Sequence, residues 1–424
     1  MEENTIQQSL PLSDSTTHYL LFVGTYTNRS SDGIYVFQFN EDNGSLRSLG
    51  LAAQAVNPSA LTLITKDHHH TGMNGLLAVQ ETRKATDGLP GAVVSYAIDN
   101  ASGQLKMIDQ APSHGDGPCS IALDDTGQYV FIANFWGGAL TVLPIQEDLR
   151  FAAATAIIET MDRSSQIEAK PHAFCMTPDC RFVVVAELGS NRILTYRFDK
   201  KTGRIEVPPA DIYSMKPQSG PRHLTFSMSG DTLYVINEIA CTVTVLSVKR
   251  NTGMLQFIQE ISTLGNGMSL PGDAAEIFLH PNGRFLYTST RQTSTIHLFS
   301  ISGEEERLTF IRDFMSGGDS PTVFTISPSG RWIIVGNQAS CNLAVFPIDL
   351  PTGLLGTLHS TISVDSPSSL IFYQQNQERT SDLVQNPGQD DRFASRYLEH
   401  PSSICVFDNK TSTPLHLTRN EDSE

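Results

Sequence analysis

Residues 181–205 read RFVVVAELGSNRILTYRFDKKTGRI, two runs rich in β-branched and aromatic residues, separated by a polar loop and followed by a turn that ends in Gly203. Alternating residues, as in TVTVLSV at 242–248, and the lack of any 12-residue segment with a 3.6 period predict strands rather than helices. The same pattern recurs at 231–255, 284–308 and 331–355. The turn glycines of these units lie 50 residues apart, at Gly203, Gly253, Gly303 and Gly353.

Seven such units are present, and they start near Tyr19, Gly75, Gln128, Arg181, Asp231, Arg284 and Arg331. Units of about 50 residues with roughly four strands each predict an all-β protein, a seven-bladed β-propeller. The first unit begins directly with its second strand, HYLLFVGTYT, whereas a lone first-strand sequence, SPSSLIFY at 366–373, follows the seventh unit. We therefore expect this carboxy-terminal strand to complete the first blade and close the ring, which removes exposed sheet edges.

Composition places limits on domains and partners. We expect a flexible segment at 1–18, the propeller at 19–373 and a polar, acidic tail at 374–424 that is disordered apart from a short β segment, SSICVFD. The net charge of −16 argues against a nucleic-acid partner. The chain has neither a long apolar run nor a secretory signal, so we expect no membrane span, a cytoplasmic location and, from the closed core, a monomer.

The cysteines and histidines give little sign of a metal centre. The six cysteines form no C-x-x-C pair, and we expect them to be reduced residues of the core. Three adjacent histidines in the loop 65–75 lack a fixed geometry, so we expect a solvated loop. The sequence thus predicts no metal ion and no other cofactor.

Charged residues cluster where the repeat predicts a functional mouth. In a propeller, the loops that enter the innermost strands and leave the second strands open on one face, around the central channel. Units four to six place charged residues at both positions, whereas most other units have neutral ones. The candidates are His172, Glu187, Arg222, His223, Glu238, Glu276 and Arg291, with Gln338 from unit seven.

These residue types suggest acid–base chemistry on an anion. Arg222 and Arg291 would form a fork for a carboxylate or phosphate, and His172 would act as a general base. Glu238 would orient Arg222 or His172, and Glu276 would orient Arg291. The chain has no G-x-S-x-G motif, so attack by activated water or proton transfer is favoured over a covalent intermediate. The alternative is a set of ion pairs that satisfy one another or serve a protein partner.

Several segments resemble the seven-bladed lactonase family, which includes bacterial propeller-type 6-phosphogluconolactonases and fungal carboxymuconate cyclases. The resemblance covers 19–372 and is carried by FVGTYT, YVFIANFWGGALTVLPI, KPHAF, GPRHLTFSMSGDTLYVINE and AAEIFLHPNGRFLYTSTR. It implies a small, anionic lactone substrate, and it implies that the catalytic set is His172, Arg222, Glu238 and Arg291. The substrate-binding candidates beside them are His223, Glu276, Glu187 and Gln338.

Three positions differ from the usual residues of this family, and they bear on how an anionic substrate would be recognised. Ser120 stands where members often have His, Thr322 where they often have Arg, and Glu187 where Asp is more usual. The loss of a cationic position makes recognition of a phosphate less secure than lactone chemistry. Three functions stay open: a lactone hydrolase in which His172 activates water, a lactonizing cyclase that uses the same base and fork, and a non-catalytic propeller that binds a protein or a small acid.

Overall fold

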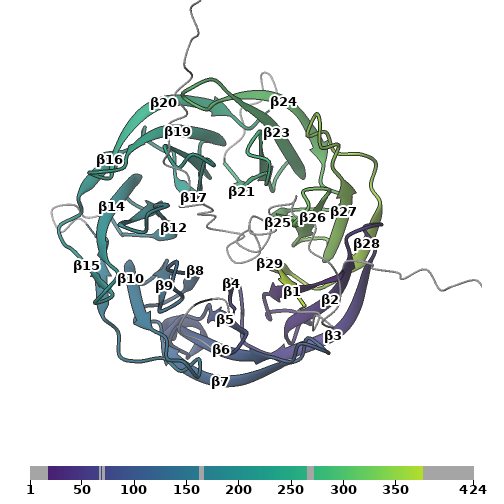
Figure 1. Ribbon diagram of the computed structural model, residues 1–424, viewed down its shortest axis with the longest axis horizontal. Coiled ribbons are helices and arrows are strands. Elements are labelled where there is room, and N and C mark those ends of the chain that lie inside the picture. The colour runs from purple at the N-terminus through teal and green to yellow at the C-terminus, as the bar shows by residue number, and fades with distance from the viewer. Residues whose placement is uncertain (1–17, 66–67, 69–71, 162–166, 265–271, 376–424) are drawn as a thin grey trace, which may run out of the picture.

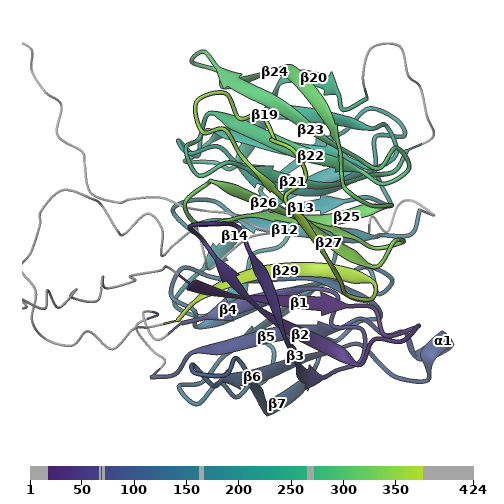
Figure 2. The same ribbon diagram turned by 90° about the vertical axis from the view of Figure 1, so that its right-hand side faces the viewer.

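The computed structural model describes residues 18–65, 68, 72–161, 167–264 and 272–375. Seven antiparallel sheets are arranged in a ring about a common axis (Figure 1). This arrangement confirms the predicted seven-bladed β-propeller. The side view shows the blades stacked around that axis, with the short helix α1 (Lys84–Asp87) projecting at one face (Figure 2).

The first four blades are built, from the axis outward, as follows. Blade one consists of β29 (Pro367–Gln374), β1 (His18–Thr25), β2 (Gly33–Asn40) and β3 (Leu46–Gln54). Blade two consists of β4 (Leu61–Ile64), β5 (Gly75–Gln80), β6 (Ala92–Ile98) and β7 (Leu105–Pro112). Blade three consists of β8 (Pro118–Leu123), β9 (Tyr129–Asn134), β10 (Ala139–Pro144) and β11 (Ala156–Glu159). Blade four consists of β12 (Pro171–Met176), β13 (Phe182–Glu187) and β14 (Arg192–Asp199), which pairs with both β15 (Arg204–Ile205) and β16 (Asp211–Ser214).

The last three blades repeat the plan. Blade five consists of β17 (Pro221–Phe226), β18 (Thr232–Asn237), β19 (Thr242–Lys249) and β20 (Met254–Ser262). Blade six consists of β21 (Ala274–Leu279), β22 (Phe285–Thr290), β23 (Thr295–Ser302) and β24 (Arg307–Met315). Blade seven consists of β25 (Pro321–Ile326), β26 (Trp332–Asn337), β27 (Asn342–Pro347) and β28 (Ser360–Ser363).

The hydrophobic core lies between blades. Every residue of β13 and β18 is buried, because each second strand is covered on both faces by neighbouring blades, whereas the outermost strand β11 alternates between half-buried and exposed. Phe131 of blade three packs against Phe174 and Phe198 of blade four, with ring centroids 5.9 and 4.9 Å apart. Such contacts explain why a single unit needs its neighbours to bury its faces.

The recurring turn glycine also serves blade packing. Gly203 has a φ of +66°, and a Cβ atom there would lie 2.1 Å from Cε1 of Tyr129 in the preceding blade. Gly44 has a φ of +70°, and its Cβ would lie 2.4 Å from Cζ3 of Trp332 in blade seven. Glycine is therefore required twice over, by the backbone conformation and by the aromatic ring against which the turn packs.

The ring closes through the carboxy-terminal strand, as predicted. Strand β29 pairs antiparallel with β1, and Phe22 lies opposite Ile371. A second link joins blades one and seven. Ser327, which follows β25, donates a 2.7 Å hydrogen bond from Oγ to Oε1 of Glu41, which follows β2. Trp332 Nε1 also donates to the Glu41 carbonyl oxygen at 3.0 Å. The first blade is thus held by both ends of the described chain (Figure 1).

Some expectations need correction, and others fall outside the described residues. His68 is 5% exposed, so the expectation that its loop is solvated is wrong at this residue. Cys119 and Cys341 are only half-buried, unlike the three other described cysteines, and all five are free thiols. The segment 1–17 and residues 376–424, including SSICVFD and Cys405, lie outside the described residues. In the part of the chain described here, no helix is long and apolar enough to cross a membrane.

Candidate active site

Irregular strand starts direct side chains to the channel mouth. In four inner strands the pairing register shifts immediately after the entry proline, as between Pro171 and Ala173. The residue skipped by this β-bulge leaves the alternation of the strand and can turn toward the axis. The skipped residues are Cys119, His172, Arg222 and Thr322. This geometry explains why two adjacent residues, Arg222 and His223, line the same cavity.

The second strands contribute through the residue that follows each of them. Strands β1, β5 and β9 end at Thr25, Gln80 and Asn134, and the next residue lines the cavity in each case. These next residues are Tyr26, Glu81 and Phe135. In blades five, six and seven, the equivalent residues are Glu238, Arg291 and Gln338, which contact residues near the mouth instead.

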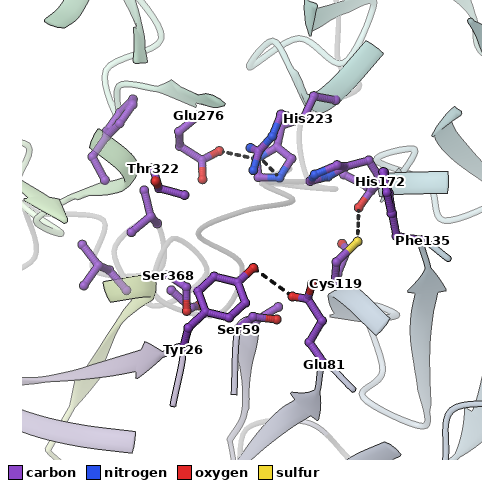
Figure 3. A pocket seen from close by; sticks show the side chains of 18 of the residues that line it. Tyr26, Ser59, Glu81, Cys119, Phe135, His172, His223, Glu276, Thr322 and Ser368 are labelled. Atoms are coloured by element: carbon purple, nitrogen blue, oxygen red, sulfur yellow. Dashed lines mark hydrogen bonds and ion pairs between the residues drawn. The ribbon is translucent and has the colours of Figure 1, made fainter. Parts of the chain in front are cut away.

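A cavity of about 210 Å³ occupies this mouth. One side is formed by His172, His223 and Glu276, and the facing side by Tyr26 and Glu81 (Figure 3). The other polar or aromatic lining residues are Ser59, Cys119, Ser120, Phe135, Trp136, Arg222, Thr322, Phe324, Ser368 and Ser369. Concave sites with a few convergent polar groups are typical of small-molecule binding.

Arg222 is fixed on two sides and keeps one donor group available. Its side chain is nearly buried, and Nε lies 3.0 Å from Oε2 of Glu238. Its Nη1 donates to the carbonyl oxygen of Ala275 at 2.6 Å and lies 3.2 Å from Nε2 of His223. Among the described residues, none accepts a hydrogen bond from Nη2. Arg222 therefore reaches the cavity wall as an oriented guanidinium group.

A hydrogen-bonded pair, His223 and Glu276, supports the guanidinium group of Arg222. His223 Nδ1 lies 2.7 Å from Oε1 of Glu276, which also accepts the backbone N–H of Ile277 at 3.0 Å. These neighbours fit a neutral imidazole in which Nδ1 donates to Glu276 and Nε2 accepts from Arg222. Burial lowers the pKa of His223, although the adjacent Glu276 opposes that change. Glu276 therefore fixes the ring of His223 and does not contact Arg291.

The second arginine is neutralised outside the cavity lining. Arg291 Nη2 lies 2.6 Å from Oδ1 of Asp273 and 2.9 Å from Oε1 of Glu238. Glu238 therefore bridges Arg222 and Arg291, and two carboxylates balance the two guanidinium groups. Because Arg291 is absent from the cavity wall, the two arginines do not form an open fork for an anion.

His172 has an apolar and cationic environment. Its Nδ1 is buried without a hydrogen-bond partner, and its ring lies 5.0 Å from the ring of His223 and 5.5 Å from that of Phe135. Burial lowers its pKa well below 6.5, and the charges of Arg222 and Arg291 act in the same direction. The imidazole is therefore neutral at neutral pH and can accept a proton.

Glu187 and Gln338 are placed differently. Glu187 is fully buried, and its carboxylate accepts the backbone N–H groups of Lys170, Gly189 and Ser190. It organises the loop before β12 and does not line the cavity. Gln338 accepts a 3.0 Å hydrogen bond from Oγ1 of Thr322, a lining residue. Both side chains thus support the wall from outside.

The candidates selected from the sequence do not include an aromatic and acidic part of the site. Tyr26, Glu81 and Trp136 all line the cavity. Two cationic side chains, Arg83 and Lys170, lie over the ring of Trp136. Arg83 Cζ lies 4.0 Å from its centroid and Lys170 Nζ lies 5.0 Å from it. Among the described residues, no group of three or more His, Cys, Asp or Glu side chains is arranged to hold a metal ion.

The fold is a seven-bladed propeller, and histidines, an arginine and buried carboxyl groups lie at its mouth. This combination is typical of a protein that binds a small molecule. The chain matches the family described as "Lactonase, 7-bladed beta-propeller" over residues 20–372. It therefore belongs to the family of seven-bladed β-propeller lactonases.

Named relatives agree with this family. The chain is 29% identical to a 6-phosphogluconolactonase of Bacillus subtilis, over 85% of this chain and 99% of that protein. It is 28% identical to a 6-phosphogluconolactonase of Formosa agariphila, over 83% and 99%. The solved structure of a periplasmic gluconolactonase from Pseudomonas aeruginosa has a TM-score of 0.77 and 29% identity, and the alignment covers 85% of this chain and all of that one. These relatives support a lactone hydrolase.

Proposed function

We propose that this protein hydrolyses the ester bond of a sugar δ-lactone, with 6-phosphogluconolactone as the first candidate substrate. The observation that carries the proposal is the pairing of a neutral histidine, His172, with an oriented guanidinium group, Arg222, in one cavity wall. The names of the relatives from Bacillus subtilis and Formosa agariphila support the choice of substrate.

The reaction follows from the roles that these two side chains can take. A water molecule beside His172 gives one proton to the unprotonated nitrogen of the imidazole ring, while the water oxygen attacks the lactone carbonyl carbon. Arg222 Nη2 donates to the carbonyl oxygen and stabilises the negative charge that develops there. A histidine with a lowered pKa is a weak base. It suffices because sugar lactones hydrolyse even without a catalyst.

The substrate's phosphate needs a cation that is not already neutralised. Arg222 and Arg291 share Glu238 and Asp273, so we place the phosphate at the rim instead, beside Trp136. Arg83 and Lys170 stack on that ring, and among the described residues Lys170 has only the exposed Glu168, at 3.4 Å, as an ion-pair partner. Exposed pairs of this kind contribute little, so a phosphate dianion can replace the carboxylate.

The test compares freshly made 6-phosphogluconolactone with glucono-δ-lactone, each corrected for spontaneous hydrolysis. We expect enzymatic turnover, and a His172→Gln variant should lower kcat roughly 100-fold or more because it lacks a general base. His359→Gln, which removes a histidine outside the cavity, serves as the matched control. Full turnover by His172→Gln would contradict the assigned base, and no turnover of either lactone by the wild type would contradict the function.

The remaining assignments stay predictions. The lactonizing cyclase and the non-catalytic binding propeller are not favoured by the names of the relatives. A cytoplasmic location and a monomeric state rest on the sequence alone, and the matched protein of Pseudomonas aeruginosa is named as periplasmic.

A further inference from the structure

The cavity has a second pair of polar groups opposite His172. Tyr26 follows β1 in blade one and Glu81 follows β5 in blade two. The hydroxyl of Tyr26 donates a 3.0 Å hydrogen bond to Oε2 of Glu81, and both side chains line the cavity (Figure 3). Neither residue takes part in the mechanism described so far.

The backbone around this pair is fixed by one asparagine. Glu81 N–H donates to the carbonyl oxygen of Asn57 at 3.0 Å, and Asn57 Nδ2 donates to the carbonyl oxygen of Glu81 at 3.2 Å. Asn57 Oδ1 accepts the backbone N–H of Thr27, next to Tyr26, at 2.9 Å. Asn57 has a φ of +42°, an uncommon conformation that these contacts maintain. The loops of Tyr26 and Glu81 are therefore held in one arrangement.

The surroundings of Glu81 shift its carboxyl group toward the protonated form. Among the described residues, no lysine or arginine forms an ion pair with it. Burial raises its pKa, and the neighbouring hydroxyl groups of Ser59 and Tyr26 and the more distant charge of Arg222 lower it only in part. The titratable and charged groups around it are Tyr26, Asp87, Cys119 and Arg222, with His172 across the cavity.

A proton donor in this position would accelerate lactone hydrolysis. When water has added to the carbonyl, the ring oxygen must leave as an alkoxide, which is a poor leaving group unless it is protonated as the bond breaks. His172 has then taken a proton from the water, and a separate acid on the other side of the substrate can protonate the ring oxygen in the same step. A base and an acid that face each other across one cavity are a usual arrangement for such a reaction.

We propose that Glu81 is the general acid that protonates the ring oxygen of the lactone, and that Tyr26 positions its carboxyl group. The proposal rests on the proposed lactone hydrolysis. Water forms a bond to the carbonyl carbon and loses one proton to His172. The bond between carbonyl carbon and ring oxygen breaks, and the ring oxygen takes the proton of Glu81. The proton on His172 returns to Glu81 through water, so the sum is lactone plus water to hydroxy acid.

The test uses the full-length protein and whichever of 6-phosphogluconolactone and glucono-δ-lactone the wild type hydrolyses faster. Absence of wild-type turnover on both lactones would count against the proposed function, whereas a defect confined to Glu81 variants bears on the acid alone. We expect Glu81→Gln to lower kcat roughly 100-fold. It should also abolish the fall of kcat with rising pH that deprotonation of Glu81 causes. Glu81→Asp, which keeps an acid, should recover part of the rate and retain this alkaline limb.

A second variant keeps the proposal testable if Glu81→Gln does not fold. Tyr26→Phe removes a hydrogen bond that stabilises the ionised carboxylate, so the pKa of Glu81 should rise and the alkaline limb should move to higher pH. A purely structural role would lower activity without moving that limb. Wild-type kcat in Glu81→Gln, an unchanged alkaline limb in that variant, or no upward shift in Tyr26→Phe would overturn the proposal.

Discussion

Nδ1 of His223 in blade five lies 2.7 Å from Oε1 of Glu276 in blade six, and this contact determines how the neighbouring arginine is presented to the cavity. With Nδ1 turned to the carboxylate, Nε2 faces Nη1 of Arg222 at 3.2 Å. The guanidinium group is therefore positioned by a chain of contacts that crosses two blades. Such supporting contacts commonly determine whether a catalytic group is held precisely enough.

Replacing Glu276 should impair catalysis more than folding. In Glu276→Gln, the side chain keeps its shape but loses the negative charge that orients the His223 ring, so Arg222 is held less precisely. We expect kcat to fall roughly 10- to 100-fold, since a buried hydrogen bond to a charged group contributes about 1.5–3 kcal/mol. Steady-state kinetics on a sugar lactone, with a thermal melt of each variant, measures this effect.

The matched control is Glu41→Gln, which changes another buried carboxylate between two blades, at the far end of the strands from the cavity. It should lower the melting temperature and leave kcat of the folded protein unchanged. Equal losses of kcat in both variants would mean that Glu276 acts only through stability.

The cations at the rim should determine preference for a phosphorylated substrate. We expect Arg83→Gln/Lys170→Gln to raise KM for 6-phosphogluconolactone roughly 10-fold or more and to leave glucono-δ-lactone nearly unaffected, because only the former carries the anion. Arg47→Gln/Lys106→Gln removes two cations from outer strands and controls for net charge. A parallel loss on both lactones would show that the rim does not distinguish the phosphate.

Closure of the ring can be tested by two truncations. A chain ending at Asp365 lacks β29, exposes the edge of β1 and removes Ile371 and Phe372 from the core, so we expect it to aggregate or to melt at a much lower temperature. A chain ending at Gln375 keeps β29 and should melt like the full-length protein. Equal melting temperatures for the chain ending at Asp365 and the full-length protein would contradict the role assigned to this strand.

Repeat analysis predicted the blades and the mouth because both follow from periodicity. It could not predict which of two neighbouring residues faces the channel, since a β-bulge or a strand end interrupts the alternation. Glu187 is the last residue of β13 and binds loop amides, whereas Glu81 comes one residue after β5 and reaches the cavity. Glu238 also comes one residue after its strand, so aligning the units on strand ends would have singled out Tyr26 and Glu81.

The sequence also could not show which charged side chains form ion pairs with one another. The positions of Arg222 and Arg291 were predicted near one mouth, but their spacing along the chain says nothing about which carboxylates neutralise them. Glu238 contacts both, and Asp273, a residue in an inner-strand entry loop, completes the balance. The expected anion fork followed from residue type alone, and the geometry separates the two arginines.

A buried histidine far from the proposed chemistry should make folding sensitive to acid. His297 on β23 is 1% exposed, its Nε2 contacts Oγ1 of Thr290 and Thr295, and burial lowers its pKa from 6.5 to about 4. Between these two values the unfolded chain binds a proton that the folded protein does not. The stability contribution of the neutral ring is therefore complete above about pH 6.5 and is lost as the pH falls toward 4.

Replacing this histidine should reduce that acid sensitivity. One proton of difference changes the free energy of unfolding by about 1.4 kcal/mol per pH unit. His297→Gln cannot titrate, so its stability should fall less steeply than that of the wild type between pH 6.5 and 4, even if it is lower at pH 7. Urea unfolding at several pH values measures both slopes. Identical slopes for His297→Gln and the wild type would assign the acid sensitivity to the other buried histidines.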